Sequence, residues 1–174
     1  MPPKVIKSDL SAVEERETLA RARRDLERLL HYRPRSRHEA EQRLKQKGHR
    51  AEMIARLLDE AERRGWLNDE AFAKLWIADR LLGKPKSARA LRRELLTKGL
   101  SKETIERALA KADLNEEELA WQLIQQRWPR YVGDEPSERE RKLAAFLARR
   151  GFAPSLIRST LHRLATQDEQ ADEN

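Results

Sequence analysis

A glycine turn recurs three times along the chain, at intervals of about 50 residues, a period typical of stacked helical repeats. Each glycine directly follows a cation, with a leucine four residues before it and an isoleucine six residues after it. The glycines are Gly48, Gly99 and Gly151, the cations Lys47, Lys98 and Arg150, the leucines Leu44, Leu95 and Leu147, and the isoleucines Ile54, Ile105 and Ile157. Such agreement in register indicates supersecondary units of one architecture.

Each of these glycines is predicted to end one helix and to precede another. The residue after a helix often adopts the left-handed conformation, where glycine has no Cβ to clash. The preceding cation lies at the negative end of the helix dipole. The next helix is expected two residues later, where Ser101 can cap a helix and Pro154 suits a first helical position. We therefore interpret the three glycines as structural turns of helix-turn-helix units.

A further helix is predicted before each of these helix pairs. It is indicated by apolar residues four positions apart, which fall on one helical face. These stripes are Ala22, Leu26 and Leu30, then Ala73, Ile77 and Leu81, then Ala120, Ile124 and Trp128. Asn68 and Asn115 each stand five residues before the alanine of a stripe, and both are predicted N-caps.

These elements predict an all-α fold, an elongated tandem array of three three-helix modules. The modules are expected over residues 12–65, 66–113 and 114–165, between a flexible N-terminus (1–11) and an acidic disordered tail (166–174). Ser36 with Glu39, and Ser137 with Glu140, match the spacing of a capping box. The loop before the second helix is longer in the third module than in the other two.

The composition argues against catalysis. The chain has no cysteine, and its four histidines show no spacing that suits a metal. No constellation of nucleophile, base and orienting group can be assembled, so we predict a non-enzymatic protein without metal or cofactor. No signal peptide or apolar run of transmembrane length is present, which predicts a cytoplasmic protein. We expect no membrane partner, because no helix joins a wide apolar face to a basic one, and we expect a monomer.

The charge of the chain instead favours a polyanionic partner. The net charge is +7 and the isoelectric point is about 9.9. Cations concentrate in the loop, second helix and glycine turn of each module. The candidate partner-binding residues are Arg33, Arg35, Arg37, Arg43, Arg80, Lys84, Lys86, Arg89, Arg92, Arg93 and Lys98. An ordinary solvated surface is the alternative interpretation.

These candidate residues together form the predicted basic strip. Its middle segment, residues 80–102, is the most basic, since it contains Glu94 as its one acid. Leu91 and Leu95 are expected to face the core, so that Arg92 and Arg93 point mainly to solvent. An aromatic ring beside cations can stack on a base, but we expect the four tryptophans mainly to pack between helices.

The central sequence resembles the RecX family of regulatory proteins. The family carries a Gly–aromatic–Leu–Asp/Asn–Asp element, then Phe-Ala, then a Lys-Gly turn followed by Ile. Here these residues are Gly65, Trp66, Leu67, Asn68, Asp69, Phe72, Ala73, Lys98, Gly99 and Ile105. The segment "YRPRSRHEAEQRLKQKG" (32–48) is similar to the first module of the family, and the resemblance extends over about residues 20–165.

The resemblance implies a helical regulator of the RecA recombinase. Members of the family bind the RecA–DNA filament and restrain its ATPase, strand-exchange and co-protease activities, which connects them with recombination, DNA repair and the SOS response. Single- or double-stranded DNA would be met weakly or within the filament. The alternative is a direct DNA-binding protein whose helix after each glycine reads bases. Acidic residues on those helices, such as Glu52, Asp59 and Glu103, disfavour base reading.

Overall fold

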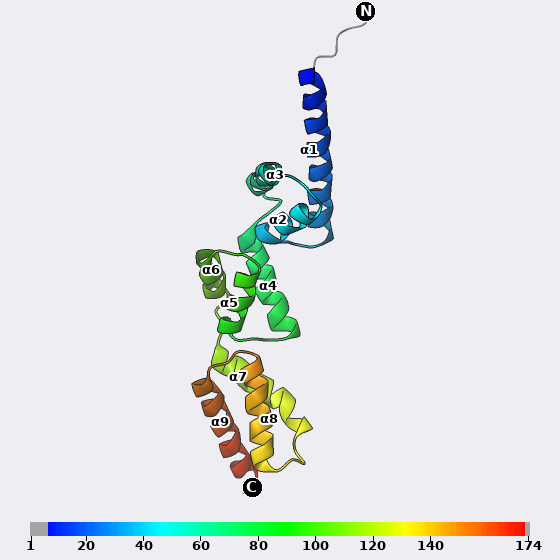
Figure 1. Cartoon of the computed structure of the whole chain (residues 1–174). Coiled ribbons are helices and arrows are strands. Elements are labelled where there is room, and N and C mark those ends of the chain that lie inside the picture. Colours follow the sequence, from blue (N-terminus) through cyan, green and yellow to red (C-terminus); the bar gives the residue numbers. More distant parts are fainter. Residues whose placement is uncertain (1–6, 173–174) are drawn as a thin grey trace, which may run out of the picture. The chain divides into compact units, whose positions relative to one another are not determined.

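The computed structural model describes the backbone of residues 7–172 and the side chains of residues 14–167. Over this part of the chain the regular structure is helical, without a strand, as predicted (Figure 1). The α-helices are α1 (Lys7–Tyr32), α2 (Arg37–Gln46), α3 (Ala51–Arg63), α4 (Asp69–Gly83), α5 (Ala88–Thr97), α6 (Lys102–Ala112), α7 (Glu116–Arg127), α8 (Pro136–Arg149) and α9 (Pro154–Asp172). A short 3-10 helix, η1 (Trp128–Arg130), follows α7. The helices form the predicted tandem series of triplets, α1–α3, α4–α6 and α7–α9.

The chain divides into two compact units, and each is described by itself. The first contains the chain up to Phe72 together with the short segment Thr97–Ser101. The second contains Ala73–Leu96 and the chain from Lys102 onward. These units cut across the middle triplet, because the turn between α5 and α6 packs with the first unit.

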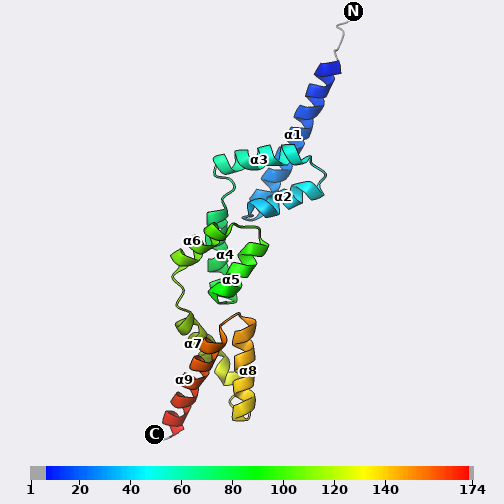
Figure 2. The ribbon, with the colours of Figure 1, turned by 60° about the vertical axis from the view of Figure 1, so that its left-hand side comes forward.

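The first unit has its core among α1, α2 and α3, which contact one another (Figures 1 and 2). Ala22 and Leu26 of the predicted stripe on α1 are buried, and Leu30 is half-buried at the edge. Burying each such aliphatic side chain contributes roughly 1.5–3 kcal/mol before the cost of ordering it. Ile54, Leu57 and Leu58 of α3 complete the core.

The second unit buries the corresponding faces of its helices. Ile77 of α4 and Leu91 and Leu95 of α5 are almost without exposed surface, as the stripe and the turn predict. The triplet α7–α9 has its own core, in which Ile124 and Leu147 are fully buried. η1 and the longer loop of this triplet are held by a guanidinium of Arg139 lying 4.1 Å from the ring centre of Trp128 and by an ion pair between Lys142 and Asp134.

The predicted helix ends are largely confirmed. Gly48, Gly99 and Gly151 have φ angles of 82°, 80° and 90°, in the left-handed region. The side chains of Asn68 and Asn115 accept hydrogen bonds from the backbone N–H groups of Ala71 and Glu118 at 2.9 and 3.0 Å. Pro154 is the first residue of α9.

The capping box predicted at Ser137 is wrong. Helix α8 begins one residue earlier, at Pro136, and its N-cap is Glu135, which makes no side-chain cap hydrogen bond. Proline fixes the backbone angle of a first helical position and needs no cap for its missing N–H, so it starts the helix in place of serine.

The two ends of the chain are more helical than the sequence suggested. Helix α1 begins at Lys7, so residues 7–11 of the predicted flexible N-terminus are helical, and residues 1–6 lie outside the described part. Helix α9 continues to Asp172, through most of the predicted disordered tail, whose last two residues are not described. Neither extension contains a glycine or an interior proline to stop the helix.

A repeated joint connects the start of a second helix with a later glycine turn. In the first unit, the joint is built on Ser36, which is fully buried. Its hydroxyl donates to the carbonyl of Lys98 at 2.6 Å and accepts from the N–H of Glu39 at 3.1 Å. A carboxylate oxygen of Asp69 accepts the N–H of Arg37 at 2.8 Å. The first N–H groups of α2 therefore find partners both locally and from α4, as a buried helix end requires.

The second unit contains the same joint on other residues. Ser87 is buried, its N–H donates to the carbonyl of Arg150 at 3.1 Å, and its hydroxyl accepts from the N–H of Ala90 at 3.2 Å. Glu116 of α7 accepts the N–H of Ala88 at 2.6 Å, in the role that Asp69 has in the first unit. The period seen in the sequence is therefore also a period of tertiary contacts.

The joint explains why glycine is needed at two of the three turns for more than its backbone angle. A methyl group added at Gly99 would lie 2.3 Å from Cβ of His38, and one at Gly151 would lie 2.7 Å from Cβ of Ala90. At Gly48 the same methyl group would meet nothing within 4 Å. The left-handed angle is common to all three, whereas close approach is specific to the two joints.

Gly99→Ala and Gly48→Ala should therefore differ in stability although their backbone angles match. Both changes place a Cβ in the left-handed region, at a cost of about 1–2 kcal/mol. Gly99→Ala should cost a further ~1–3 kcal/mol, because α2 must move away from the turn. Urea denaturation followed by circular dichroism measures both values. Equal losses would contradict the role assigned to the joint.

Candidate partner-binding surface

Two of the four predicted cations of the first module are paired with acids of their own unit. Arg33 makes two hydrogen bonds with Glu39, both at 3.1 Å, and Lys98 reaches the same carboxylate at 2.7 Å. Arg37 bridges Asp59 and Glu62 at 2.7 and 2.5 Å. These groups hold α2 against α3 and against the turn after α5, so much of their charge is neutralised inside the fold.

The remaining two cations of this segment make weaker contacts. Arg35 is half-buried, and its Nε lies 3.4 Å from the carbonyl of Leu29. Burial, with the neighbouring charge of Arg33, lowers its pKa below the ordinary arginine value. Arg43 is exposed and donates to the side chain of Gln46 at 3.1 Å.

Two of the predicted cations of the middle module, Arg80 and Lys86, contact Glu94. This carboxylate accepts from Arg80 at 2.8 Å, from the indole N–H of Trp76 at 2.9 Å, and from Lys86. Burial alone would raise the pKa of Glu94, but the hydrogen bonds from Lys86 and Arg80 lower it overall. The guanidinium of Arg80 also lies 4.1 Å from the ring centre of Trp76. The one acid of this basic segment thus gathers two of its cations into a structural cluster.

The arginines of α5 lie at the surface, and two of them have partners that the sequence analysis did not predict. Arg92 forms a two-pronged ion pair with Glu106 of α6 at 2.5 and 2.8 Å. Arg89 donates to the carbonyl of Gly151 at 3.2 Å and so belongs to the second joint. Neither partner was predictable from the local sequence, because Glu106 lies on another helix and Gly151 in a later turn. Arg93 and Lys84 are exposed.

A basic face on α1 was missed by the sequence analysis. Arg21, Arg24 and Arg28 are exposed and, with Lys47 and Asp25, line a shallow hollow of the first unit. Lys47 is paired with Asp25 at 2.6 Å, whereas the three arginines have no carboxylate in ion-pair range among the described residues. The spacing of three and four residues, which places them on one helical face, was the signal that could have revealed them.

The histidine beside this hollow is part of the same cluster. His49 is almost buried and lies 2.9 Å from Asp25. Hydrogen bonds from Lys47 and His49 lower the pKa of Asp25 to about 2. Asp25 therefore stays charged at neutral pH and offsets one of the neighbouring cations.

The tryptophans follow the packing expectation only in part. Trp121 is buried in the core of the third triplet, and the guanidinium of Arg163 lies 4.1 Å from its ring centre. Trp66 is half exposed and has Arg64 over its ring at 4.9 Å. It follows Gly65, whose positive φ turns the chain out of α3 and leaves the ring at the surface.

The described residues contain neither a candidate metal site nor a membrane-spanning helix. No group of three His, Asp or Glu side chains in this part of the chain is placed to hold a metal ion. None of the described helices is long and apolar enough to span a membrane. The groups described above are mainly charged side chains at the surface, which suits binding.

Comparison with known proteins places this arrangement in a class. Residues 68–109 match the family model "RecX, second three-helix domain", and residues 115–161 match "RecX, third three-helix domain". Together these matches cover more than half of the chain. The protein is thus of the class built from tandem three-helix domains.

Individual relatives give the family. The chain is 38% identical over 134 residues to the regulatory protein RecX of Mycobacterium sp. (strain JLS), covering 74% of this chain and 73% of that one. It is 33% identical over 158 residues to the RecX of Streptomyces coelicolor, covering 90% and 84%. The crystal structure of RecX from Lactobacillus salivarius shares the fold, with a TM-score of 0.75 at 19% identity over 86% of this chain and 98% of that one. The chain belongs to the RecX family.

The ion pairs of Glu39 should make stability depend on pH. Burial alone would raise the pKa of Glu39, but hydrogen bonds from Arg33 and Lys98 lower it from 4.5 to about 2. Stabilisation by the charged carboxylate is therefore complete above pH 4.5 and is lost as the pH falls toward 2. Glu39→Gln should be less stable than the native chain at pH 7, with a difference that shrinks at pH 3. Urea denaturation at both values measures this.

The control for that comparison is Glu52→Gln, which removes one carboxylate from an exposed position on α3. It should change stability by less than about 0.5 kcal/mol at pH 7. A Glu39→Gln deficit that is the same at pH 3 and pH 7 would contradict the lowered pKa.

Proposed function

We propose that this protein regulates the RecA recombinase by binding the RecA–DNA filament and restraining its ATPase, strand-exchange and co-protease activities. The observation that carries the proposal is membership of the RecX family, through two matched three-helix domains and relatives named as regulatory proteins. The basic surfaces support it, since a filament of protein and nucleic acid presents phosphate and carboxylate groups. The protein acts as a binding partner and carries out no catalysis of its own.

We further propose that exposed cations without an internal acid make the contacts with the filament. The predicted strip contributes Arg43 and Lys84, and helix α1 adds the arginine face found in the structure. Paired residues such as Arg37 and Arg92 hold the fold together and are less available. Withdrawing them would expose an uncompensated carboxylate on the neighbouring helix.

Direct base reading by the helix after a glycine turn has less support. On α6, Arg107 is paired with Glu103 at 3.1 Å, and Glu106 with Arg92. The carboxylates of this helix reduce its attraction for phosphate. Contact with DNA is therefore proposed as secondary to contact with the recombinase.

The protein should slow ATP hydrolysis by RecA on single-stranded DNA while hydrolysing no ATP by itself. Binding should be much tighter to RecA-coated DNA than to the same DNA without recombinase. A coupled ATPase assay and fluorescence anisotropy at equal salt measure the two quantities. Unchanged hydrolysis at saturating protein, together with equal affinity for coated and naked DNA, would favour the direct DNA-binding alternative.

The arginine face of α1 can be tested by changing Arg21, Arg24 and Arg28 together to glutamine, which keeps helix propensity. The loss of three exposed charge contacts, each contributing about 0.5 kcal/mol to binding, should weaken filament binding roughly tenfold. The loss should shrink with added salt, because exposed charges are screened.

The matched control replaces Lys111, Arg141 and Arg158, three exposed cations of the second unit, by glutamine. It makes the same change of net charge and should weaken binding by less than about threefold. If both triple variants lost affinity equally, net charge and not the α1 face would be responsible.

A further inference from the structure

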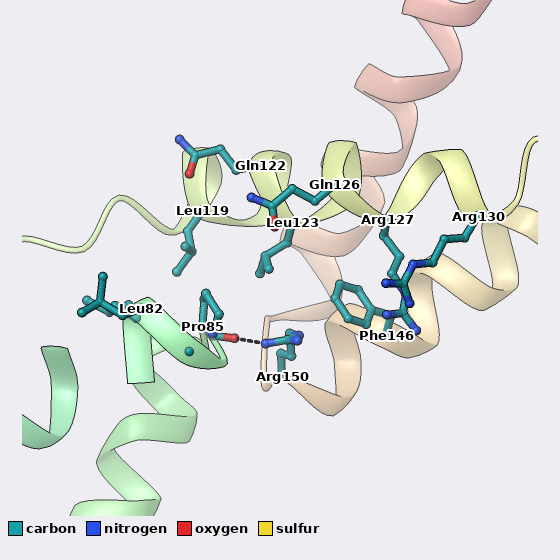
Figure 3. A pocket seen from close by; sticks show the side chains of 12 residues that line it. Leu82, Pro85, Leu119, Gln122, Leu123, Gln126, Arg127, Arg130, Phe146 and Arg150 are labelled. Atoms are coloured by element: carbon teal, nitrogen blue, oxygen red, sulfur yellow. Dashed lines mark hydrogen bonds between the residues drawn. The ribbon is translucent and has the colours of Figure 1, made fainter. Parts of the chain in front are cut away.

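A pocket in the second unit collects three arginines without an acid. It lies between the loop that follows α4 and the helices α7 and α8, and has a volume of about 320 Å³. Arg127 and Arg130 come from the end of α7 and from η1, and Arg150 from the end of α8. Figure 3 shows their side chains around the ring of Phe146, with Leu82 at the opposite end of the pocket.

The contacts of the three guanidinium groups leave their charge uncompensated. Arg150 donates to the carbonyl of Pro85 at 2.6 Å, and Arg127 lies 3.4 Å from the hydroxyl of Tyr131. Neither these two nor Arg130 has a carboxylate in ion-pair range among the described residues, and no carboxylate lines the pocket. Burial, together with the positive charge of Arg127, lowers the pKa of Arg150. A bound anion would offset the repulsion among these guanidinium groups and would accept hydrogen bonds from them.

This arrangement differs from the other basic clusters of the chain. The cations around Glu94 and Glu39 have an acid at their centre. In the pocket, the central position is occupied by the aromatic ring of Phe146, with the guanidinium carbons of Arg127 and Arg150 at 4.9 and 4.6 Å from its centre. The ring orients the guanidinium groups while leaving their N–H donors available.

The rest of the pocket is apolar at one end. Leu82 is 89% exposed, the highest exposure of any large hydrophobic residue in the described part of the chain. Leu119 and Leu123 continue this lining towards Phe146. Covering an exposed leucine with an aliphatic side chain of a ligand removes apolar surface from water, which favours binding.

Two features favour a peptide over a nucleic acid as the occupant. The ring of Phe146 is only 8% exposed and is stacked with arginines, so it offers no free face to a base. The apolar end at Leu82 would gain nothing from a phosphate backbone. The pocket is also at the small end of the roughly 300–1,000 Å³ range of ligand sites, which suits one or two side chains.

We propose that this pocket binds an acidic segment of a protein, with a carboxylate on Arg127, Arg130 and Arg150 and a neighbouring aliphatic side chain on Leu82. Arginine recognises carboxylates through paired N–H donors, and arginine and aromatic residues are common among the dominant contacts of interfaces. The proposal goes beyond the proposed function, because it names a pocket and a ligand chemistry and does not require the segment to belong to the recombinase.

The experiment uses the whole chain and a fluorescent peptide, acetyl-Glu-Glu-Leu-Glu-Glu-amide, with binding followed by anisotropy at low salt. Arg130→Gln is the main variant, because Arg130 is exposed and makes no contact on which the fold depends. Arg141→Gln removes an equal charge from an exposed position of α8 outside the pocket. Arg130→Gln should weaken binding about fivefold, equivalent to about 1 kcal/mol, and Arg141→Gln less than twofold.

Leu82→Ala distinguishes an acidic peptide that contains a leucine from one that contains only glutamates. It should weaken binding of the leucine-containing peptide about threefold and leave binding of penta-glutamate unchanged, because only the former reaches the apolar end. Equal effects of Arg130→Gln and Arg141→Gln would overturn the proposal, as would a peptide affinity that Leu82→Ala does not change. So would a single-stranded oligothymidylate that binds more tightly than the peptide and depends on Arg130, since that result would assign the pocket to nucleic acid.

Discussion

The close approach of a glycine turn to the buried start of a helix is the constraint on which each unit depends. At both joints a serine occupies the helix start and donates to a backbone carbonyl of the turn, through its hydroxyl at Ser36 and through its N–H at Ser87. A carboxylate from a further helix accepts the first N–H of the helix. Each partner satisfies a group that would otherwise be buried without a hydrogen bond. A three-helix module is too small to bury much surface alone, so such joints supply stability that its own core lacks.

The same joints determine what the charged residues can do. Lys98 and Glu39 meet because the turn after α5 packs on α2, and Arg89 reaches Gly151 because the turn after α8 packs on α5. Cations next to a joint are thus committed to the fold. Arg21, Arg24 and Arg28 on α1, and Arg127 and Arg130 beside Phe146, have no carboxylate partner among the described residues, and we propose that they meet a partner.

Local features of this protein were predictable from its sequence, and long-range pairing was not. The glycine turns, the asparagine caps and the buried leucines follow from rules that act within one or two helical turns. The burial of Ser36 and Ser87, and the pairing of Arg92 with Glu106, depend on which helix packs on which turn. A single sequence contains the charges but not their partners. The predicted strip therefore stays a prediction, because the sequence did not show which of its cations are paired within the fold.

The central claim is that cations paired within the fold and cations that meet the partner are different residues. A cryo-EM map of this protein on a RecA–DNA filament tests it most directly. We expect Arg21, Arg24 and Arg28 to contact the filament, while Arg37 and Arg92 keep their partners on α3 and α6. A map in which the α1 arginines face solvent and the ion pairs of Arg37 and Arg92 are broken to reach the filament would contradict it.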